Sequence, residues 1–193
     1  MPIFKISPEM LLGENKTEVK NGDVGSGIVG NYNTIEIMKR VARERSCNPL
    51  VRELALRILE GAGVKSQDYI NEAKAIGTYV QKKVRYVRDI EGVETLHDPL
   101  TLIDQIKRNQ AHGDCDDMAL LIATLLLSIG HQPYFAIVKY HKNPNGGFNH
   151  IYTVVYEKNW GSPNKKRIVL DAILKRAPIG TEVRYVSKEE IKV

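Results

Sequence analysis

The chain has 193 residues, of which 42% are hydrophobic and 26% are charged. This composition excludes wholesale disorder and collagen-like repeats, and the length is sufficient to bury a core without disulfides or structural metals. The longest strongly apolar run, Met118–Ile129, is well short of the roughly 20 residues of a membrane span, so we expect a core helix there and no membrane partner. Residues 1–16 lack a basic region followed by an apolar one, so we expect no secretory signal.

The formal net charge is +5, from 28 basic and 23 acidic residues. The basic residues are scattered and no aromatic side chains are interleaved with them, so we expect no nucleic-acid partner. The two cysteines, Cys47 and Cys115, form neither a disulfide framework nor a CxxC metal motif. This usage is typical of a reducing compartment, and we therefore expect a cytoplasmic protein.

The hydrophobic pattern divides the chain into an N-terminal segment and one domain. Residues 1–33 contain several glycines and show no sustained period, which predicts an extended arm or mobile leader. Residues 34–193 are predicted to form a single domain, with a helical first part over 34–110 and a core that carries the candidate site over 111–193. Apolar residues at helical spacing predict four helices in the first part, which begin at Thr34, Pro49, Ser66 and Pro99.

A fifth helix is predicted from near Cys115 to Gly130. Because this helix is apolar on nearly all sides, we expect it to be the buried central helix of the domain. The period then changes to that of strands, and runs separated by turn residues predict an antiparallel meander. These runs are Tyr134–Tyr140, His150–Glu157 and Arg167–Ala172, with Val183–Val186 as a further edge strand. The predicted fold class is therefore α+β, with a central helix packed on an antiparallel sheet.

The motif from His112 to Asp117, HGDCDD, comes directly before the apolar helix. A cysteine in the first turn of a helix lies among unpaired backbone N–H groups, and the helix dipole favours its thiolate. Asp114, Asp116 and Asp117 suit a helix N-terminus as capping residues, but their charges disfavour thiolate. A reactive Cys115 would therefore need a cationic partner such as a histidine.

His150 and Asp171 are the candidate partners of this cysteine. They lie in consecutive predicted strands at equal distances from the turn around Trp160 and Gly161. In a symmetric antiparallel hairpin such residues face each other, with Cβ atoms about 5 Å apart. The aspartate could then accept a hydrogen bond from one ring nitrogen and orient the other towards a nucleophile.

The order Cys, His, Asp in these elements resembles the transglutaminase-like superfamily, in particular members found in phages and prophages. The likeness covers roughly residues 34–175. It is carried by the matching segments Tyr79-Val80, Val84–Asp89, Asp98–Leu102, Gly113–Asp117 with Ala119 and Leu120, Leu126–Gly130, Asn149–Tyr152 and Val169–Asp171.

The resemblance implies a papain-like α+β core with Cys115 as nucleophile, His150 as base and Asp171 as orienting group, and no cofactor. The default oxyanion donor is the backbone N–H of Cys115. By analogy with the glutamine that precedes the cysteine in papain-like enzymes, Asn109 or Gln110 could add a side-chain donor. The chain departs from the family pattern in lacking a tryptophan just before the aspartate and in having Ala172 where a proline is common.

Two further residues are assigned to the surroundings of the site. His112 is close enough in sequence to line the cleft, and Trp160 in the preceding turn could cover it. A zinc site made by Cys115, His150 and Asp171 is chemically allowed, but no fourth ligand has a characteristic spacing, so we expect no metal. The remaining histidines, His97, His131 and His141, are expected at the surface.

These observations leave two functional hypotheses. The first is a thiol-dependent acyl-transfer enzyme, a cysteine protease or amidase with a Cys-His-Asp triad, whose substrate is a protein or peptide amide. The alternative is a non-enzymatic structural or assembly factor of a phage-like particle, which keeps the fold, binds phage structural proteins and is virion-associated.

Overall fold

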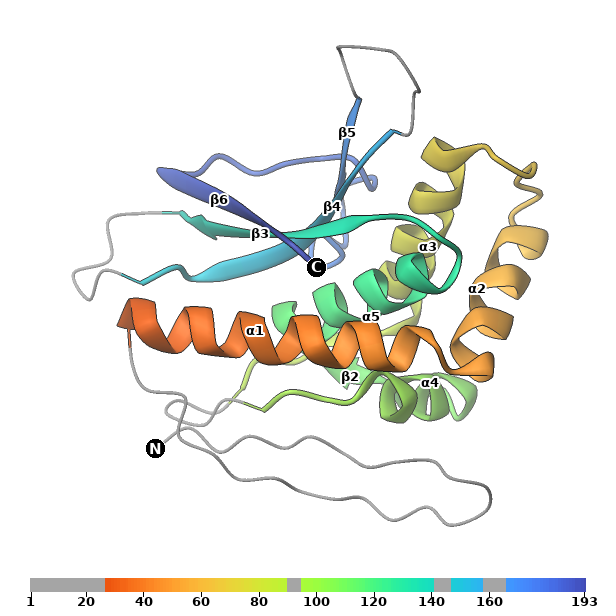
Figure 1. Ribbon diagram of the computed structural model, residues 1–193, viewed down its shortest axis with the longest axis horizontal. Coiled ribbons are helices and arrows are strands. Elements are labelled where there is room, and N and C mark those ends of the chain that lie inside the picture. Colours follow the sequence, from red (N-terminus) through yellow and green to blue (C-terminus); the bar gives the residue numbers. More distant parts are fainter. Residues whose placement is uncertain (1–26, 90–94, 141–146, 158–165) are drawn as a thin grey trace.

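The computed structural model describes residues 27–89, 95–140, 147–157 and 166–193. Within them the chain forms five helices and a four-stranded sheet (Figure 1), which confirms a mixed helix and sheet protein. The helices are α1 (Gly27–Ser46), α2 (Pro49–Gly61), α3 (Tyr69–Lys83), α4 (Pro99–Lys107) and α5 (Cys115–Ser128). No helix in these ranges is both long and apolar enough to cross a membrane.

Two of the helix starts follow directly from local sequence. Asn48 and Asp98 cap α2 and α4 by accepting hydrogen bonds from the backbone N–H groups of Leu50 and Leu100, and a proline follows each cap. This capping leaves fewer unpaired N–H groups at the helix N-terminus. Proline suits the first helical position because it has no backbone N–H that would need a partner there. The predicted starts of α2 and α4 are therefore confirmed.

The predicted starts of α1 and α3 are wrong. Helix α1 begins at Gly27 rather than Thr34, because its added turns make tertiary contacts, including the Asn31 side chain that accepts a hydrogen bond from the Phe148 N–H at 3.2 Å. Residues 27–33 are therefore helical, and residues 1–26 of the predicted leader lie outside the described residues. Helix α3 begins at Tyr69 rather than Ser66, because Gln67 has a φ of 68° and Asp68 is the cap.

The sheet has the strand order β5-β4-β3-β6 and is antiparallel throughout. Three strands, β3 (Pro133–Lys139), β4 (His150–Tyr156) and β5 (Arg167–Leu170), confirm the predicted meander. The predicted edge strand at Val183–Val186 is wrong, because the strand that pairs with β3 is β6 (Ser187–Lys192). Its sequence SKEEIK is polar, as an exposed edge permits, and so carries no apolar alternation.

A second, two-stranded parallel sheet lies beside the N-terminus of α5. It pairs β1 (Arg85–Tyr86) with β2 (His112–Gly113). Strands of two residues are too short to show a period, which is why the sequence pattern does not predict them. This pairing holds the segment after α3 next to the residues that precede Cys115.

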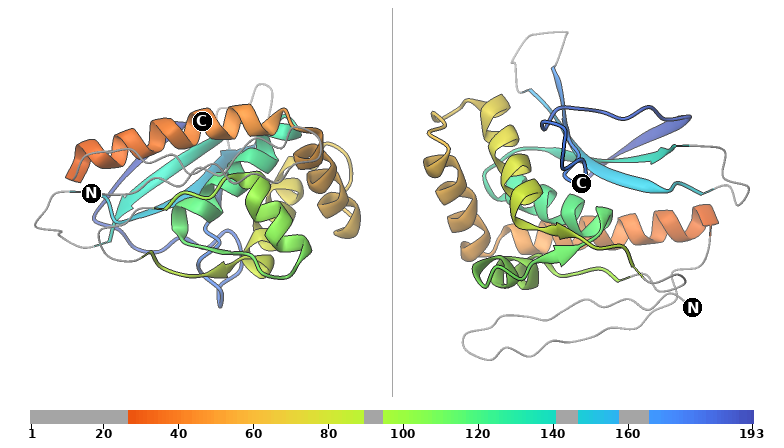
Figure 2. Two further views of the ribbon diagram at one scale, coloured as in Figure 1. Left: turned by 90° about the horizontal axis from the view of Figure 1, so that it is seen from below. Right: turned by 180° about the vertical axis from the view of Figure 1, so that it is seen from behind.

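Helix α5 forms the centre of the core, as predicted. Almost every residue from Asp116 to Ser128 is buried, and Figures 1 and 2 show the helix with the sheet on one side and α1, α2, α3 and α4 around its other sides. The Thr153 hydroxyl of β4 donates a hydrogen bond to the Ala119 carbonyl of α5 at 2.8 Å. This contact fixes the middle of β4 against the second turn of α5.

The opposite face of the sheet carries a separate apolar cluster. This cluster contains Ala136, Val138, Tyr152, Val154 and Val169. The chain between β5 and β6 passes over this face (Figure 1), and its Glu182 accepts a hydrogen bond from the Tyr152 hydroxyl at 2.5 Å. Both faces of the sheet are therefore covered, and polar groups on either face can be buried.

Candidate active site

Cys115 is the first residue of α5 and is half-buried. The preceding Asp114 and the following Asp117 form a capping box. The Asp114 side chain accepts a hydrogen bond from the Asp117 backbone N–H, and the Asp117 side chain accepts one from the Asp114 backbone N–H. A Cβ atom at position 113 would lie 2.5 Å from Oδ2 of Asp117. The glycine of the GDCDD motif is therefore required for the capping box, and the box places the thiol at the helix N-terminus.

Asp117 is paired with a histidine. Its Oδ2 lies 2.8 Å from Nδ1 of His97, and its Oδ1 accepts a hydrogen bond from the His97 backbone N–H at 2.6 Å. The hydrogen bond to Asp117 raises the pKa of His97, although burial acts in the opposite direction. The expectation that His97 is an isolated surface residue is therefore wrong, because it pairs with a fully buried carboxylate.

The surroundings of Asp116 favour its protonated form. The side chain is buried, its Oδ1 accepts a hydrogen bond from the Asp117 N–H at 2.8 Å, and its Oδ2 has no hydrogen-bond partner among the described residues. Burial, together with the nearby Asp114, raises the pKa of Asp116 well above its usual value. The carboxylates around Cys115 consequently oppose thiolate formation less than three full charges would.

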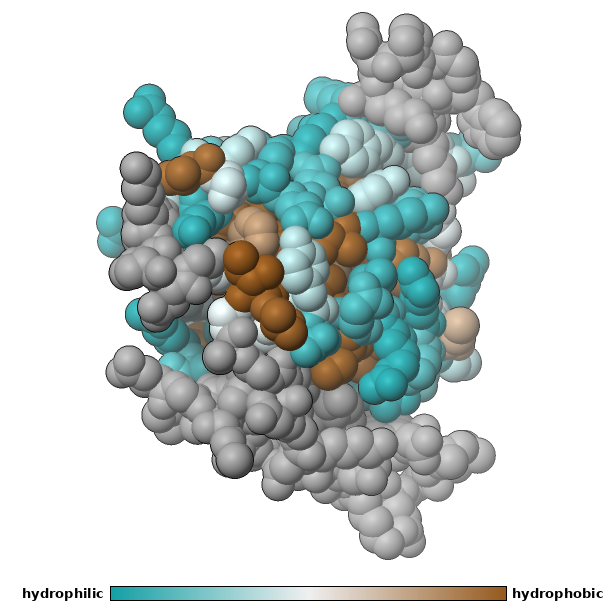
Figure 3. Space-filling model, turned by 60° about the vertical axis from the view of Figure 1, so that its left-hand side comes forward, coloured by the Kyte–Doolittle hydropathy of each residue, from teal (hydrophilic) through white to brown (hydrophobic). Residues whose placement is uncertain are grey.

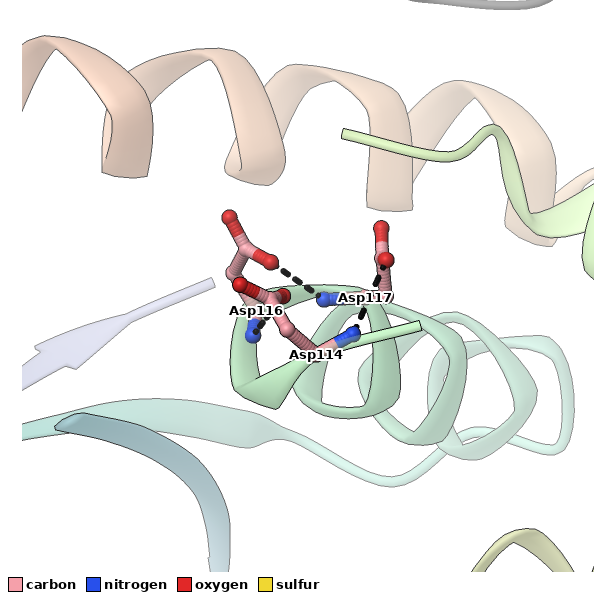
Figure 4. A group of neighbouring side chains, drawn as sticks. All are labelled: Asp114, Asp116 and Asp117. Atoms are coloured by element: carbon pink, nitrogen blue, oxygen red, sulfur yellow. Dashed lines mark hydrogen bonds between the residues drawn. The ribbon is translucent and has the colours of Figure 1, made fainter. Parts of the chain in front are cut away.

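These three aspartates also form the group that comes nearest to a cation site. One oxygen from each lies within 4.8 Å of the others, and Figure 4 shows the three carboxylates around the first turn of α5. Asp117 is already paired with His97, and burial raises the pKa of Asp116. A divalent cation prefers several ionised carboxylate ligands, and here His97 already occupies one oxygen of Asp117.

His150 and Asp171 form a buried pair. Nε2 of His150 lies 2.9 Å from Oδ2 of Asp171, and the two side chains are only 2% and 1% exposed. A second oxygen, Oδ1 of Asp171, accepts a hydrogen bond from the Ile173 backbone N–H at 3.3 Å. With Nε2 directed to the aspartate, Nδ1 is the nitrogen left for proton transfer.

The strand register behind this pair differs from the predicted one. Thr153 pairs with Leu170 and Val154 with Val169, so an extension of the register places Asp171 opposite Tyr152 and not opposite His150. The predicted register is therefore shifted by two residues. A shift of two keeps every side chain on its predicted face, and for this reason the contact of His150 with Asp171 forms as a diagonal pair.

Two tyrosines enclose the His150 ring. Tyr140 is stacked on it with ring centroids 5.1 Å apart and an interplanar angle of 26°, and Tyr152 is tilted against it at 5.6 Å. Neither tyrosine is among the site residues predicted from the sequence. Counting by two along the strands is the signal that could have found them, because Tyr140 and Tyr152 share the sheet face of His150.

Tyr140 also relates the pair to the thiol. Burial raises the pKa of its phenol, and the negative charges of Asp171 and Cys115 raise it further. Cys115 itself packs on the α5 side of the sheet, in a cluster with Phe135 and Ile151. Cys115 thus lies on the sheet face that α5 covers, whereas His150 and Asp171 share the opposite face with Tyr152 and Val169.

Tyr86 lies at the exposed side of the cysteine. It is 39% exposed, and burial together with the charges of Cys115 and Asp114 raises its pKa. The pairing of β1 with β2 holds it there.

The other predicted site residues have different positions. Asn109 ends α4 with a φ of 55° and lines a groove between α2, α3 and α4, while Gln110 is exposed and its N–H donates to the Gln105 carbonyl. His112 in β2 has its ring edge-on to His97, with centroids 5.8 Å apart. Trp160 lies outside the described residues.

Two further histidines were expected at the surface. For His131 this is wrong, because the side chain is buried and its Nε2 lies 2.7 Å from Oε2 of Glu72. This pair joins the end of α5 to the start of α3 and so has a structural role. His141 lies outside the described residues.

No family model, curated protein or solved structure matches the chain.

Proposed function

We propose that the protein is a thiol-dependent acyl-transfer enzyme, a cysteine protease or amidase that acts on a protein or peptide amide. Cys115 is the nucleophile, His150 the general base and acid, and Asp171 the group that orients the imidazole. These residues would form the catalytic centre of a papain-like, transglutaminase-like core. The observation that carries the proposal is the buried hydrogen bond between His150 and Asp171.

The proposed reaction has two steps. The thiol proton of Cys115 passes to Nδ1 of His150, the sulfur attacks the amide carbonyl, and the imidazolium returns the proton to the amine as the C–N bond breaks. Water then attacks the thioester, gives one proton to His150, and releases the carboxylic acid while the thiol is restored. The backbone N–H of Cys115, at the helix N-terminus, is the proposed donor to the oxyanion.

Asp171 and the two tyrosines have a supporting role in this mechanism. The carboxylate stabilises the imidazolium and fixes the tautomer with the proton on Nε2. Contact with the stacked ring of Tyr140 and the tilted ring of Tyr152 restricts rotation of the imidazole ring. His150 is thus held in one orientation, which proton transfer to a half-buried thiol requires.

The test is alkylation by iodoacetamide across a pH series, with each cysteine followed by mass spectrometry. Cys47 is an exposed free cysteine in the same chain and is the internal control. The proposal predicts that Cys115 reacts faster than Cys47 at neutral pH, and that His150→Ala slows Cys115 without changing Cys47. Circular dichroism of each variant checks that the fold is retained.

The same measurement bears on the alternative, a structural or assembly factor of a phage-like particle. That alternative predicts a sluggish Cys115 whose alkylation profile does not depend on His150. Cys115→Ala and Asp171→Asn complete the series: the first should abolish hydrolysis of a peptide amide, and the second should leave partial activity because the shape of the side chain is kept.

A further inference from the structure

A groove of about 920 Å³ lies between α2, α3 and α4. Neither Cys115, His150 nor Asp171 lines it. It is therefore a surface separate from the candidate active site, and its chemistry can be considered independently of the proposed reaction.

The floor of this groove is apolar and has helical spacing. Leu54 and Ile58 lie one turn apart on α2, and Ala75 and Tyr79 lie one turn apart on α3, with Ile106 of α4 at one end. Residues four apart on a helix project from the same face. The floor consequently presents two rows of apolar side chains, into which the apolar stripe of another helix can pack.

The rim of the groove is basic. Among its lining residues Arg57, Lys74, Lys82, Lys83 and Lys107 are basic and none is acidic. Arg57 is paired with Glu53 at 2.6 Å, whereas none of the ion pairs between described residues includes one of the four lysines. Lys74 and Lys82 lie two turns apart on α3, so positive charge follows the length of the groove.

We propose that this groove, formed by α2, α3 and α4, binds an acidic amphipathic helix of a protein partner. Its apolar stripe would cover the floor, and glutamates or aspartates beside that stripe would pair with the lysines of the rim. The charge of the rim selects an acidic partner and excludes a basic one, because like charges placed opposite each other across an interface cost several kcal/mol.

The shape of the groove distinguishes this partner from other anions. A nucleic-acid strand is bound through phosphate contacts and exposed stacking rings, but the aromatic residue of this floor, Tyr79, is half-buried between its neighbours. A membrane surface would require a convex apolar face, whereas this one is concave between helices. A helix with an apolar stripe satisfies both the floor and the rim.

The test uses a fluorescein-labelled model peptide and fluorescence anisotropy with the full chain. The acidic probe has leucines at helical spacing and glutamates on both sides of them, and the basic probe has lysines in place of the glutamates. Reversal of two rim charges, Lys74→Glu with Lys107→Glu, should weaken binding of the acidic probe by about tenfold or more. The matched control, Arg40→Glu with Arg43→Glu, changes the net charge equally on the exposed side of α1 and should leave affinity within about twofold.

A second variant tests the floor. Leu54→Ser removes an apolar contact without changing charge and should also weaken the acidic probe. The proposal is overturned if the groove and control reversals weaken binding equally, or if the basic probe binds as tightly as the acidic one. It is also overturned if an oligodeoxythymidine strand competes with the acidic probe and loses affinity in the same groove variant, because the groove is then a nucleic-acid site.

Discussion

His97 contacts Asp117 through both its backbone and its side chain, at 2.6 Å and 2.8 Å. These two hydrogen bonds join the segment before α4 to the first turn of α5. Because the carboxylate is fully buried, an imidazolium at this position compensates a charge that would otherwise be costly. The pair therefore contributes to the stability of the helix start that holds Cys115.

The first prediction concerns the pH dependence of this pair. The pKa of His97 is raised by its hydrogen bond to Asp117, so the stabilisation is fully present below the unfolded pKa of about 6.5 and is lost as pH rises through the raised value. His97→Gln keeps a polar side chain and removes the charge. In urea unfolding it should be less stable than the wild type at pH 5.5, by about 1.5–3 kcal/mol, and the difference should shrink towards pH 9. A difference that is constant with pH would contradict the ion pair.

The second prediction concerns the central helix. Leu121 and Leu125 of α5 are both 0% exposed. Replacement of either by alanine should lower the free energy of unfolding by about 2–5 kcal/mol, through lost transfer energy and a residual cavity. Leu56 of α2 is 48% exposed and is the matched control, for which Leu56→Ala should cost no more than about 0.5 kcal/mol. Equal effects in urea melts would mean that the buried position of α5 is wrong.

Local chemistry explains which parts of this fold can be predicted from sequence. Asn48-Pro49 and Asp98-Pro99 predict helix starts because capping depends on neighbouring residues alone. The all-apolar stretch after Cys115 predicts a buried helix for the same reason. The contact of His150 with Asp171 is predicted because strand alternation tolerates a register error of two residues.

The features that could not be predicted depend on distant residues. The first turns of α1 gain their contacts from Phe148, far along the chain. Likewise the buried His131 pairs with Glu72. These two residues are far apart in the chain, and neither helical nor strand spacing predicts their contact. Strand β6 is held by pairing with β3, so its polar sequence carries no signal of its own.

The third prediction concerns Tyr140 and rests on the proposed function. Tyr140→Phe keeps the ring stacked on His150 and should leave the alkylation rate of Cys115 nearly unchanged. Tyr140→Ala removes one wall of the imidazole site, so His150 should lose its orientation and Cys115 should react more slowly. Tyr134→Ala in β3, the strand that Tyr140 follows, is the control, because Tyr134 packs edge-on against Tyr156 instead. Equal rates in Tyr140→Ala and the wild type would remove Tyr140 from the site.

The last prediction concerns Asp116, whose buried carboxyl has a pKa raised mainly by desolvation and then by Asp114. An aspartate with a raised folded pKa stabilises the fold most below its unfolded pKa of about 3.9, and this contribution is lost as pH rises through the folded value. Asp116→Asn has the shape of the protonated acid and does not titrate. It should therefore unfold at higher urea concentration than the wild type at pH 8, and the gain should disappear near pH 3.5.

The matched control for this variant is Asp104→Asn. Asp104 is 43% exposed and paired with Arg108 one turn away on α4, so its replacement should cost about 0.5 kcal/mol or less at pH 8 and should stabilise nothing. If Asp116→Asn destabilises the protein at pH 8, the carboxyl is ionised in the folded state. The negative charge beside Cys115 would then be larger, and thiolate formation would depend more strongly on the imidazolium of His150.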